Sequence, residues 1–519
     1  MLCRERPEIV GRKTPAALLV LIAVVAGQAI SAMADIISPL KVTLVDSSAG
    51  VATICQVDFG FPGTLPKDGQ IVITFPSGFD VSGVAIAASP NHSIDGGFQV
   101  SVHAATRTVT VTRDGTGSVK TGYANARISI ALVDNATTPG TYAVTLETRD
   151  GSETTIDGPS TSSSFQIVPG ALHHFILSGL PTSRTAGIPF PNPVDVTAYD
   201  VYGNVKTNYV GQVYFTSTDA AATLPYTSGS RYTFTGGDAG IHSFPGDGFV
   251  LRTAGARTIT VTDGSIARES SAIQVSAGAI AAFDLSVGLS QVAGVPFPLS
   301  VNNAVDSEGN PASGTVAVTV ASGGGNSPNG SVPTLSYITV VAGAGSANQT
   351  LVNAVGTALQ GTVGSVVRTT GTISVQPGAL GSFTLTGYPA AVTAGSTFGT
   401  NNVAVAAYDA YGNPKTNYTG QVYFTSTDAQ AVLPYTPSSR YTFTLGDGGV
   451  HTFSGTGFAL KTAGAQTVTV TDGAAGVSQQ SGPIAVSPGA LHSFTLSNPG
   501  TQVAGVGFEL SVSGARDQY

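Results

Sequence analysis

The sequence is poor in cysteine, tryptophan and charge. It holds two cysteines and no tryptophan, and charged residues make up 10% of its 519 residues. Cys3 lies in a segment that we expect to be removed, so Cys55 would have no partner and an internal disulfide is excluded. The formal charge is −8, and removal of residues 1–34, with four basic and two acidic groups, leaves −10. This sparse acidic charge argues against nucleic acid and anionic lipid as partners.

Signatures of catalysis are also missing. The chain has no HExxH motif, no pair of cysteine ligands and no GxSxG motif. Acidic pairs are sparse, and none has the surroundings of a glycosidase site. The glycines form no phosphate-binding loop between a strand and a helix. The sequence therefore predicts no enzyme, with no catalytic, cofactor-binding or metal-binding residues and no cofactor.

The N-terminus has the pattern of an export signal. A basic stretch with Arg4, Arg6, Arg12 and Lys13 precedes an apolar run over residues 16–27, and small residues follow at Ala32 and Ala34. Twelve apolar residues are short for a membrane span, which needs about 20. We expect residues 1–34 to be a cleaved signal peptide; an uncleaved anchor is the alternative. With no other candidate span, we expect an extracellular or cell-surface protein.

Alternating apolar and polar residues dominate the next part of the chain. This period of two predicts strands at residues 40–44, 70–75, 107–111, 127–132 and 142–146. Turn formers separate them, and no stretch of ten residues has helical periodicity. Residues 35–168 are therefore predicted to form an N-terminal β-sandwich, which ends in a polar linker at residues 157–164.

The remainder is built from repeats. Residues 200–219 return, slightly altered, at 409–428, and residues 211–220 are identical to 420–429. A Pro-Gly-Ala-Leu signature at Pro169, Pro377 and Pro488, varied at Ala277, begins each repeat. The phenylalanines of the strands that follow are 108, 100 and 111 residues apart. A fixed spacing of this size indicates tandem modules, predicted at residues 169–276, 277–376, 377–487 and 488–519.

Each complete module has the strand pattern of an immunoglobulin-like sandwich. Seven alternating segments of the first module begin at Phe175, Val194, Val213, Tyr232, Phe249, Ile259 and Ile273, and the third module repeats them at Phe383, Val403, Val422, Tyr441, Phe458, Val468 and Ile484. The cysteine pair and tryptophan of antibody domains are absent, so packing alone must hold each core. The middle module diverges and has a loose glycine-rich segment at residues 322–330. The fold class predicted is all-β, with tandem immunoglobulin-like β-sandwich modules in an extended array.

The repeated strings resemble known families. The stretch from AYDAYGNPKTNYTGQVYFTSTD to TAGAQTVTVTD resembles the bacterial immunoglobulin-like repeats of large secreted and surface proteins. The Asp-x-x-Gly-Asn-Pro turn is similar to that of invasin- and intimin-type modules. The resemblance covers residues 169–519, and it implies a stalk or adhesin-like role without catalytic residues. Within 35–168, ITFPSGFDVSG and TPGTYAVTLET resemble β-sandwich modules near the start of prokaryotic surface proteins.

Histidines and tyrosines are the side chains from which a hidden site could be built. His242 and His451 occupy equivalent repeat positions, as His174 and His492 do roughly, and a residue copied with its module is more simply structural. The tyrosines could form an aromatic sugar platform, although we favour half-buried positions at sandwich edges. They are Tyr199, Tyr202, Tyr209, Tyr214, Tyr226 and Tyr232, mirrored at Tyr408, Tyr411, Tyr418, Tyr423, Tyr435 and Tyr441.

The Asp-x-x-Gly-Asn corner recurs at residues 200–204, 306–310 and 409–413, and its first three positions recur at 517–519. We interpret it as a tight turn in which Asp accepts a backbone N–H and Gly and Asn tolerate positive φ. The alternative is a calcium site, but two obvious side-chain ligands are too few for the six to eight oxygens that calcium takes.

These observations favour a non-catalytic stalk or adhesion array, a monomeric rod that contacts a protein or glycan of a host or neighbouring cell. The alternative is a spacer region of an exported polysaccharide-active enzyme whose catalytic domain lies beyond residue 519. Because the last corner stops at Tyr519, we expect the sequence to be the beginning of a longer protein.

Overall fold

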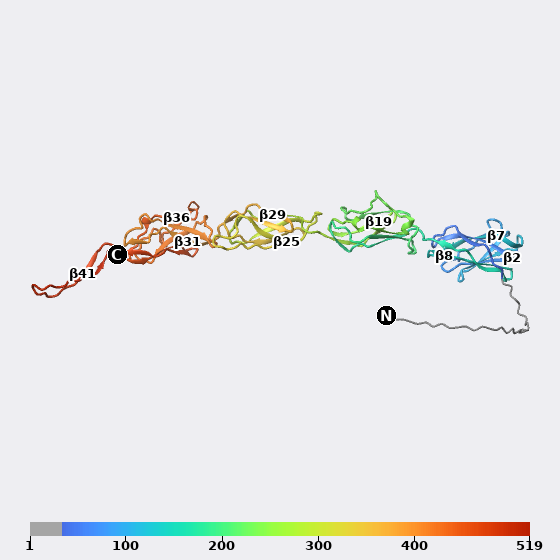
Figure 1. Cartoon of the computed structure of the whole chain (residues 1–519), viewed down its shortest axis with the longest axis horizontal. Helices are drawn as coiled ribbons and strands as arrows, with labels where there is room; N and C mark the ends of the chain where they lie inside the picture. Colours follow the sequence, from blue (N-terminus) through green and yellow to red (C-terminus); the bar gives the residue numbers. More distant parts are fainter. Residues whose placement is uncertain (1–33) are drawn as a thin grey trace, which may run out of the picture.

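The computed structural model describes residues 34–519, and nearly all of their regular structure is β. The predicted signal peptide thus lies, except for Ala34, outside the described residues. Small β units follow one another along a rod (Figure 1). Buried side chains form four separate clusters, which span Ile37 to Ile167, Phe175 to Val275, Ile280 to Val375 and Phe383 to Val486. We call the parts that hold them the N-terminal unit and units 1, 2 and 3. The predicted fold class is confirmed, and the predicted boundaries stay a proposal.

The N-terminal unit is a sandwich of two antiparallel sheets. One sheet has the order β1-β2-β7-β4 and the other β10-β9-β3-β6-β5, and a β8-β11 pair lies beside them. Buried and half-buried residues alternate along β6, as the period of two requires. The strands are β1 (Leu40–Leu44), β2 (Ala52–Leu65), β3 (Gln70–Thr74), β4 (Ala87–Ala88), β5 (Phe98–His103), β6 (Thr108–Arg113), β7 (Lys120–Asp134), β8 (Gly140–Tyr142), β9 (Thr145–Arg149), β10 (Thr155–Thr161) and β11 (Phe165–Ile167).

Two expectations for this unit are wrong. The expected polar linker is largely strand β10, and its Asp157 is fully buried, where it accepts hydrogen bonds from the Gly63 N–H (2.8 Å) and the Thr148 hydroxyl (2.7 Å). Asp157 has its partners in β2 and β9, so the polarity of this stretch did not mark a linker. The expected strand at residues 142–146 is split, because β8 ends at Tyr142 and β9 begins at Thr145 in another sheet.

Unit 1 contains three sheets around one core, in the orders β12-β14-β17, β13-β21-β18 and β16-β15-β19-β20. Two 3-10 turns, η1 (Gly236–Asp238) and η2 (Gly246–Gly248), interrupt the strands. The strands are β12 (His174–Ser178), β13 (Ser183–Thr185), β14 (Val194–Tyr199), β15 (Gln212–Ser217), β16 (Tyr232–Thr233), β17 (Ile241–Phe244), β18 (Gly255–Arg257), β19 (Ile259–Thr262), β20 (Ala267–Glu269) and β21 (Ile273–Ser276).

Units 2 and 3 repeat this arrangement, although unit 2 has no counterpart of β18 among its described strands. Unit 2 has β22 (Ala282–Ser286), β23 (Ser290–Val292), β24 (Phe297–Val305), β25 (Gly314–Ser322), β26 (Ile338–Val340), β27 (Gly345–Gln349), β28 (Ala358–Val363), β29 (Val366–Thr369) and β30 (Ser374–Gln376). Unit 3 has β31 (Leu380–Thr386), β32 (Ala391–Thr393), β33 (Val403–Asp409), β34 (Gln421–Ser426), β35 (Tyr441–Thr442), η3 (Leu445–Asp447), β36 (Val450–Phe453), η4 (Gly455–Gly457), β37 (Gly464–Gln466), β38 (Val468–Asp472), β39 (Val477–Gln480) and β40 (Ile484–Ser487). The hairpin of β41 (Ser493–Leu496) and β42 (Val512–Arg516) follows, with its strands exposed.

One of the seven expected segments is buried without being a strand. Phe249 and Leu251 are fully buried, but Val250 between them makes only isolated bridges, to Pro189 and Thr223. The strand of this region is β17, which pairs with β14. Unit 3 differs in the same way at Phe458, with β36 as the strand. The alternating apolar pattern predicted the burial of these side chains correctly, but it did not predict whether their backbone pairs in a sheet.

Candidate functional site: the joints between units

The Asp-x-x-Gly-Asn corner is a tight turn in all three complete copies. In the first, the Asp200 carboxylate accepts the N–H groups of Tyr202 and Asn204, each at 2.9 Å. Gly203 has φ +80°, and a Cβ there would meet open space, so this position needs glycine for its backbone conformation. Asp306 and Asp409 make the same bonds, with glycine φ values of +85° and +78°. The predicted roles of Asp and Gly are confirmed.

The aspartate also holds the segment that enters each unit. Its second oxygen accepts the N–H of the glycine in the Pro-Gly-Ala-Leu signature or its variant. The distances are 3.0 Å (Gly170 to Asp200), 2.8 Å (Gly278 to Asp306), 2.8 Å (Gly378 to Asp409) and 2.7 Å (Gly489 to Asp517). Burial opposes the charge of Asp200 and Asp306, but hydrogen bonds from the corner asparagine and from backbone N–H groups outweigh it, so the pKa of each carboxyl is lowered.

The asparagine crosses to the preceding unit. Its amide donates to the carbonyl oxygen of Thr137 from Asn204 (2.7 Å), of Arg252 from Asn310 (2.7 Å) and of Val352 from Asn413 (2.8 Å). In return, the Ala254 and Ala354 N–H groups donate to the side-chain oxygens of Asn310 and Asn413 at 2.8 and 2.9 Å. None of the three asparagines has positive φ, so that part of the turn interpretation was wrong. The asparagine is a connector between units.

The first joint has one fewer of these bonds for a simple reason. The Gly50 N–H donates to Ala136 O, and in unit 1 the equivalent Gly187 N–H donates to Leu251 O. Thr137 and Arg252, the residues that follow these two acceptors, are therefore counterparts. Two residues further on, Pro139 occupies the place of Ala254. Proline has no N–H to donate to Asn204.

The third corner residue lies on a glycine of the preceding unit. A Cβ on that glycine would come within 1.9 to 2.6 Å of the corner side chain, so only glycine lets the two surfaces meet. The pairs are Tyr202 on Gly50, Glu308 on Gly187, Tyr411 on Gly294 and Tyr519 on Gly395. We call each of these glycines, with its preceding alanine, a socket. All four socket glycines have φ between +69° and +80°. The Ala-Gly pair recurs in the sequence, but its role depends on a side chain of the next unit and was not predicted from it.

Each socket is tied to the strand that leads out of its unit. The Ala186 N–H donates to Ser276 O (2.8 Å), directly before the signature that begins unit 2. The same bond joins Ala49 to Val168, Ala293 to Gln376 and Ala394 to Ser487. Socket, exit and corner therefore meet at one place, which we call a joint.

In units 1 and 3 a buried aspartate holds the loop that contributes Arg252 or Lys461 to the joint. Asp219 accepts the N–H groups of Arg252 (2.6 Å) and Thr253 (2.9 Å) and the hydroxyl of Thr253 (2.6 Å). Asp428 does the same for Lys461 and Thr462. These aspartates end the repeated QVYFTSTD strings, and this contact explains why the string closes on Asp.

Unit 2 lacks that string, and its glycine-rich segment serves the next joint instead. The Asn329 N–H donates to Tyr411 O (3.2 Å), and the Asn329 amide donates to Ala410 O (3.1 Å). The segment was expected to be loose, but its end is a contact with the corner of unit 3.

The corner carboxylates have little capacity left for a cation, because both oxygens of Asp200 accept N–H donors. Within residues 34–519, no group of three or more His, Cys, Asp or Glu side chains is close enough to hold a metal ion. The contacts of the corner are those of a turn and a connector.

His242 and His451 lie in matching polar clusters inside their own units. The His242 Nδ1 is 2.7 Å from both the Asp238 carboxylate and the Tyr232 hydroxyl, and its ring stacks on Tyr232. Asp447, His451 and Tyr441 repeat this geometry. Desolvation, with the nearby Asp238, raises the pKa of Tyr232 to about 12. The expected equivalence of His174 and His492 is wrong by one position, because the His173 N–H donates to Tyr199 O as the His492 N–H donates to Arg516 O, each directly before a corner aspartate.

The tyrosines do not gather into one platform. Tyr202 and Tyr411 belong to joints, and Tyr209 and Tyr418 are buried in the cores. The Tyr418 hydroxyl donates to Asp472 at 2.6 Å. The remaining members of the repeated set are half-buried, as expected: Tyr199, Tyr214, Tyr226, Tyr232, Tyr408, Tyr423, Tyr435 and Tyr441.

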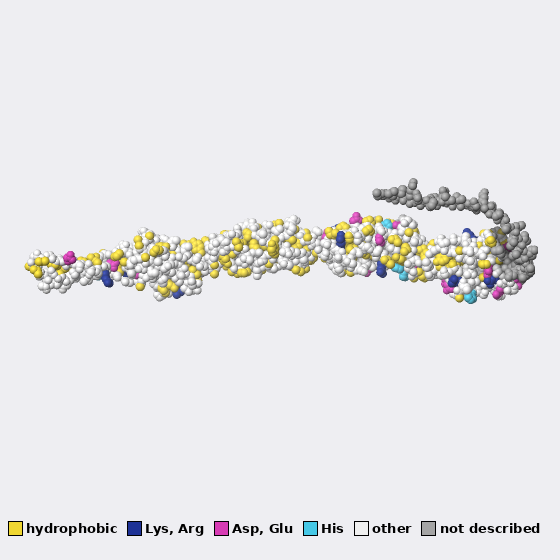
Figure 2. Space-filling view, turned by 60° about the horizontal axis from the view of Figure 1, so that its bottom comes forward, with side chains coloured by type: hydrophobic (Ala, Val, Ile, Leu, Met, Phe, Trp, Pro, Cys, Tyr) yellow, Lys and Arg dark blue, Asp and Glu magenta, His cyan; other side chains and the backbone are white. Residues whose placement is uncertain are grey.

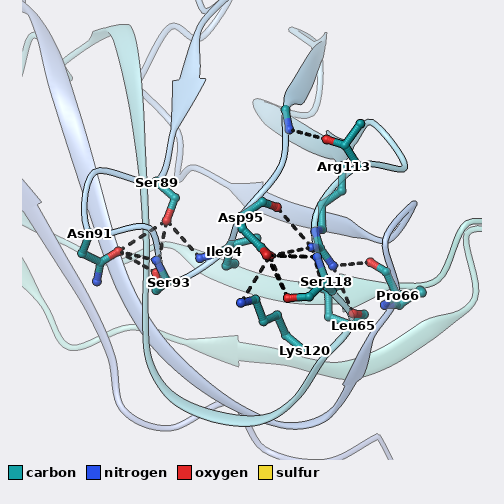
Figure 3. A network of polar contacts seen from close by, with 12 residues as sticks. Leu65, Pro66, Ser89, Asn91, Ser93, Ile94, Asp95, Arg113, Ser118 and Lys120 are labelled. Atoms are coloured by element: carbon teal, nitrogen blue, oxygen red, sulfur yellow. Dashed lines mark hydrogen bonds and ion pairs between the residues drawn. The ribbon is translucent and has the colours of Figure 1, made fainter.

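A second polar network, which the sequence analysis also missed, ties together loops of the N-terminal unit (Figure 3). The Arg113 side chain is fully buried and donates to the carbonyl oxygens of Pro66 (2.6 Å) and Ser118 (2.5 Å). It also pairs with Asp95 at 3.3 Å, and Lys120 reaches the same carboxylate at 3.2 Å. Desolvation lowers the pKa of Arg113. The network ties these loops to the buried Arg113 side chain.

Charged side chains are few on the visible surface and are more frequent toward the N-terminal end (Figure 2). No helix within the described residues is long and apolar enough to cross a membrane.

No family model and no curated protein matches this sequence. Among solved structures, the chain is similar to invasin, a bacterial integrin-binding protein, at 16% identity and a TM-score of 0.29, over 88% of this chain and 82% of that one. It is similar to the S-layer protein rSbsC(31-844) at 16% identity and 0.20, over 90% and 56%. It is similar to the ICAM-5 D1-D4 ectodomain fragment at 10% identity and 0.25, over 92% and 100%. All three TM-scores are below 0.5, so these likenesses carry no functional conclusion. By its own structure the chain is a tandem array of immunoglobulin-like β-sandwich units.

Proposed function

We propose that this chain is a non-catalytic, exported stalk in which docked corners hold β-sandwich units in line. One observation carries the proposal: the same corner-to-socket contact occurs at every junction between units, with the entering segment bonded to the corner aspartate. A flexible string of modules needs none of these contacts. Their repetition supports selection for a fixed geometry between units.

The test is the length of the particle in solution. Strands and loops give roughly 30–40 Å per unit, so four units in line span roughly 120–160 Å. Small-angle scattering of residues 35–519 should give this maximum dimension, and the triple substitution of Asn204, Asn310 and Asn413 by Ala should broaden the distribution of distances. A compact particle of one large domain's size would overturn the proposal.

The stalk role includes adhesion at the cell surface. The partner is a protein or glycan of a host or neighbouring cell, and we place the contact on the N-terminal unit, where charged side chains are more frequent (Figure 2). Beads coated with residues 35–519 should bind cells, and beads coated with chain lacking the ordered Arg113 network (Arg113→Ala) should bind less. Equal binding by both would remove the N-terminal unit from the contact.

Export is tested by the mature N-terminus. We expect mass spectrometry to show that the extracellular protein begins at Asp35. A cytoplasmic protein that retains Met1 would contradict the proposal. The purified segment should be inert on a panel of polysaccharides and esters. Reproducible hydrolysis lost by one substitution would overturn the non-catalytic role.

A further inference from the structure

The third corner residue is Glu308 in one joint and tyrosine in the other three, and the residue of the preceding unit at the Arg252 position also varies. Glu308 faces Arg252, and its two oxygens lie 2.8 and 3.0 Å from one guanidinium nitrogen. Tyr411 packs against the buried cluster of unit 2, and the residue of unit 2 that corresponds to Arg252 is the buried Val352. In these two joints the chemistry of the corner residue matches that of the surface on which it lies.

The fourth joint pairs a tyrosine corner with a cation. Lys461 occupies the Arg252 position in unit 3, and its ammonium lies 5.3 Å from the centre of the Tyr519 ring, a cation–π contact. In the first joint the counterpart is the uncharged Thr137, and the Tyr202 hydroxyl lies 3.4 Å from Gly50 O.

A mismatch at these positions has a physical cost. The Glu308 side chain is only 20% exposed in its joint, so a carboxylate in the apolar joint of Val352 would lose water without gaining a cation. Arg252 is held toward the joint by the bond of its N–H to buried Asp219 and by a contact with the Thr223 hydroxyl at 3.4 Å. Like charges placed there would repel at close range.

We propose that the exit end of unit 1 is a docking surface selective for an acidic corner, which distinguishes it from the exit ends that take tyrosine corners. The surface of unit 1, formed by Gly187, Arg252 and Ala254, takes an acidic Asp-x-Glu-Gly-Asn corner of another β-sandwich unit. The surface of unit 2, formed by Gly294, Val352 and Ala354, takes an aromatic corner. This inference rests on the proposed stalk function and adds partner selectivity to it.

Charge reversal in residues 35–519 tests the selectivity. Spin labels at Ile241→Cys and Val341→Cys report the joint between units 1 and 2, and both sites are exposed. Cys55 is buried and will not be labelled. Glu308→Lys and Arg252→Glu should each raise the population of undocked distances at least roughly threefold, and the double reversal should restore the native distribution.

The joint between units 2 and 3, labelled at Val341→Cys and Leu445→Cys, serves as the internal control and should not change in any of these variants. High salt should broaden only the distance across the ion-paired joint. Glu308→Gln keeps the shape of the side chain and should remove that salt dependence, which covers the case in which a reversed variant misfolds.

The outcomes separate the two proposals. Narrow distances in all variants and at all salt concentrations, or a double reversal no better than the single ones, would overturn the selectivity and leave the stalk intact. Broad distances at both joints in the unsubstituted protein would overturn the stalk itself.

Discussion

Replacement of Asn413 by alanine should release unit 3 from unit 2 without unfolding either. The side chain is 1% exposed, and it makes two hydrogen bonds across the joint, to Val352 O (2.8 Å) and from the Ala354 N–H (2.9 Å). The bond to Asp409 within its own corner is lost as well, but the turn keeps the backbone N–H donors of that carboxylate.

The expected cost follows from what the truncation leaves behind. Each lost bond is worth about 1 kcal/mol net, and each stranded buried partner costs about 1–3 kcal/mol unless water replaces the side chain. Because water can enter a joint at the surface of two units, we expect the docking free energy to fall by about 2–4 kcal/mol. That change raises the ratio of undocked to docked joints roughly 30- to 700-fold.

Dipolar distance measurements between labels at Val341→Cys and Leu445→Cys would detect the release as a broad distance distribution. Asn417→Ala is the matched control, because Asn417 is exposed and contacts only the Lys415 ammonium within its own unit. The reasoning would be refuted by an unchanged distribution for Asn413→Ala, or by equal broadening in the control.

Four further predictions follow from the same contacts. Gly203→Val should destabilise unit 1 by about 1–3 kcal/mol through strain at φ +80°, with no change in melting temperature on adding chelator; a chelator-sensitive, calcium-restored melting temperature would establish the calcium site instead. Gly294→Val, at the same φ, should in addition undock unit 3, because its Cβ would meet the Tyr411 ring at 2.4 Å. The distribution of distances across that joint should broaden in Gly294→Val and stay unchanged in Gly203→Val. The folded-state pKa of Asp200 is lowered, so the ionised carboxylate stabilises unit 1 fully above its unfolded pKa of about 3.9, and this stabilisation is lost as pH falls through the folded pKa. Calorimetry should therefore show the melting temperature of unit 1 falling below about pH 4. The fall should be smaller in Asp200→Asn. Burial raises the pKa of Cys55 to about 12, so its thiol should resist a disulfide reagent at pH 8 until denaturant is added, and fast native labelling would contradict its burial.

Much of the architecture was readable from local patterns. Alternation located strands such as β14 and β15 because a period of two reports which side chains face a core, and the repeated strings identified the array before any single residue was interpreted. The same signal wrongly predicted a strand at Phe249 and Leu251, because side chains can be buried where the backbone does not pair with a neighbouring strand. It failed at Asp157 too, where a charged residue is buried by partners far along the chain.

The sequence by itself determined the turn of the corner, since Asp200 and Gly203 act on atoms within four residues of each other. Only the tertiary structure decided the use of that turn. Asn413 bonds to Val352, 61 residues earlier in the chain, and a socket glycine such as Gly294 is needed because a ring from the next unit lies on it. Contacts between units depend on the position in which the last strand of one unit leaves the corner of the next. That position is determined by the folded sheets of the whole unit, and no local sequence pattern encodes it.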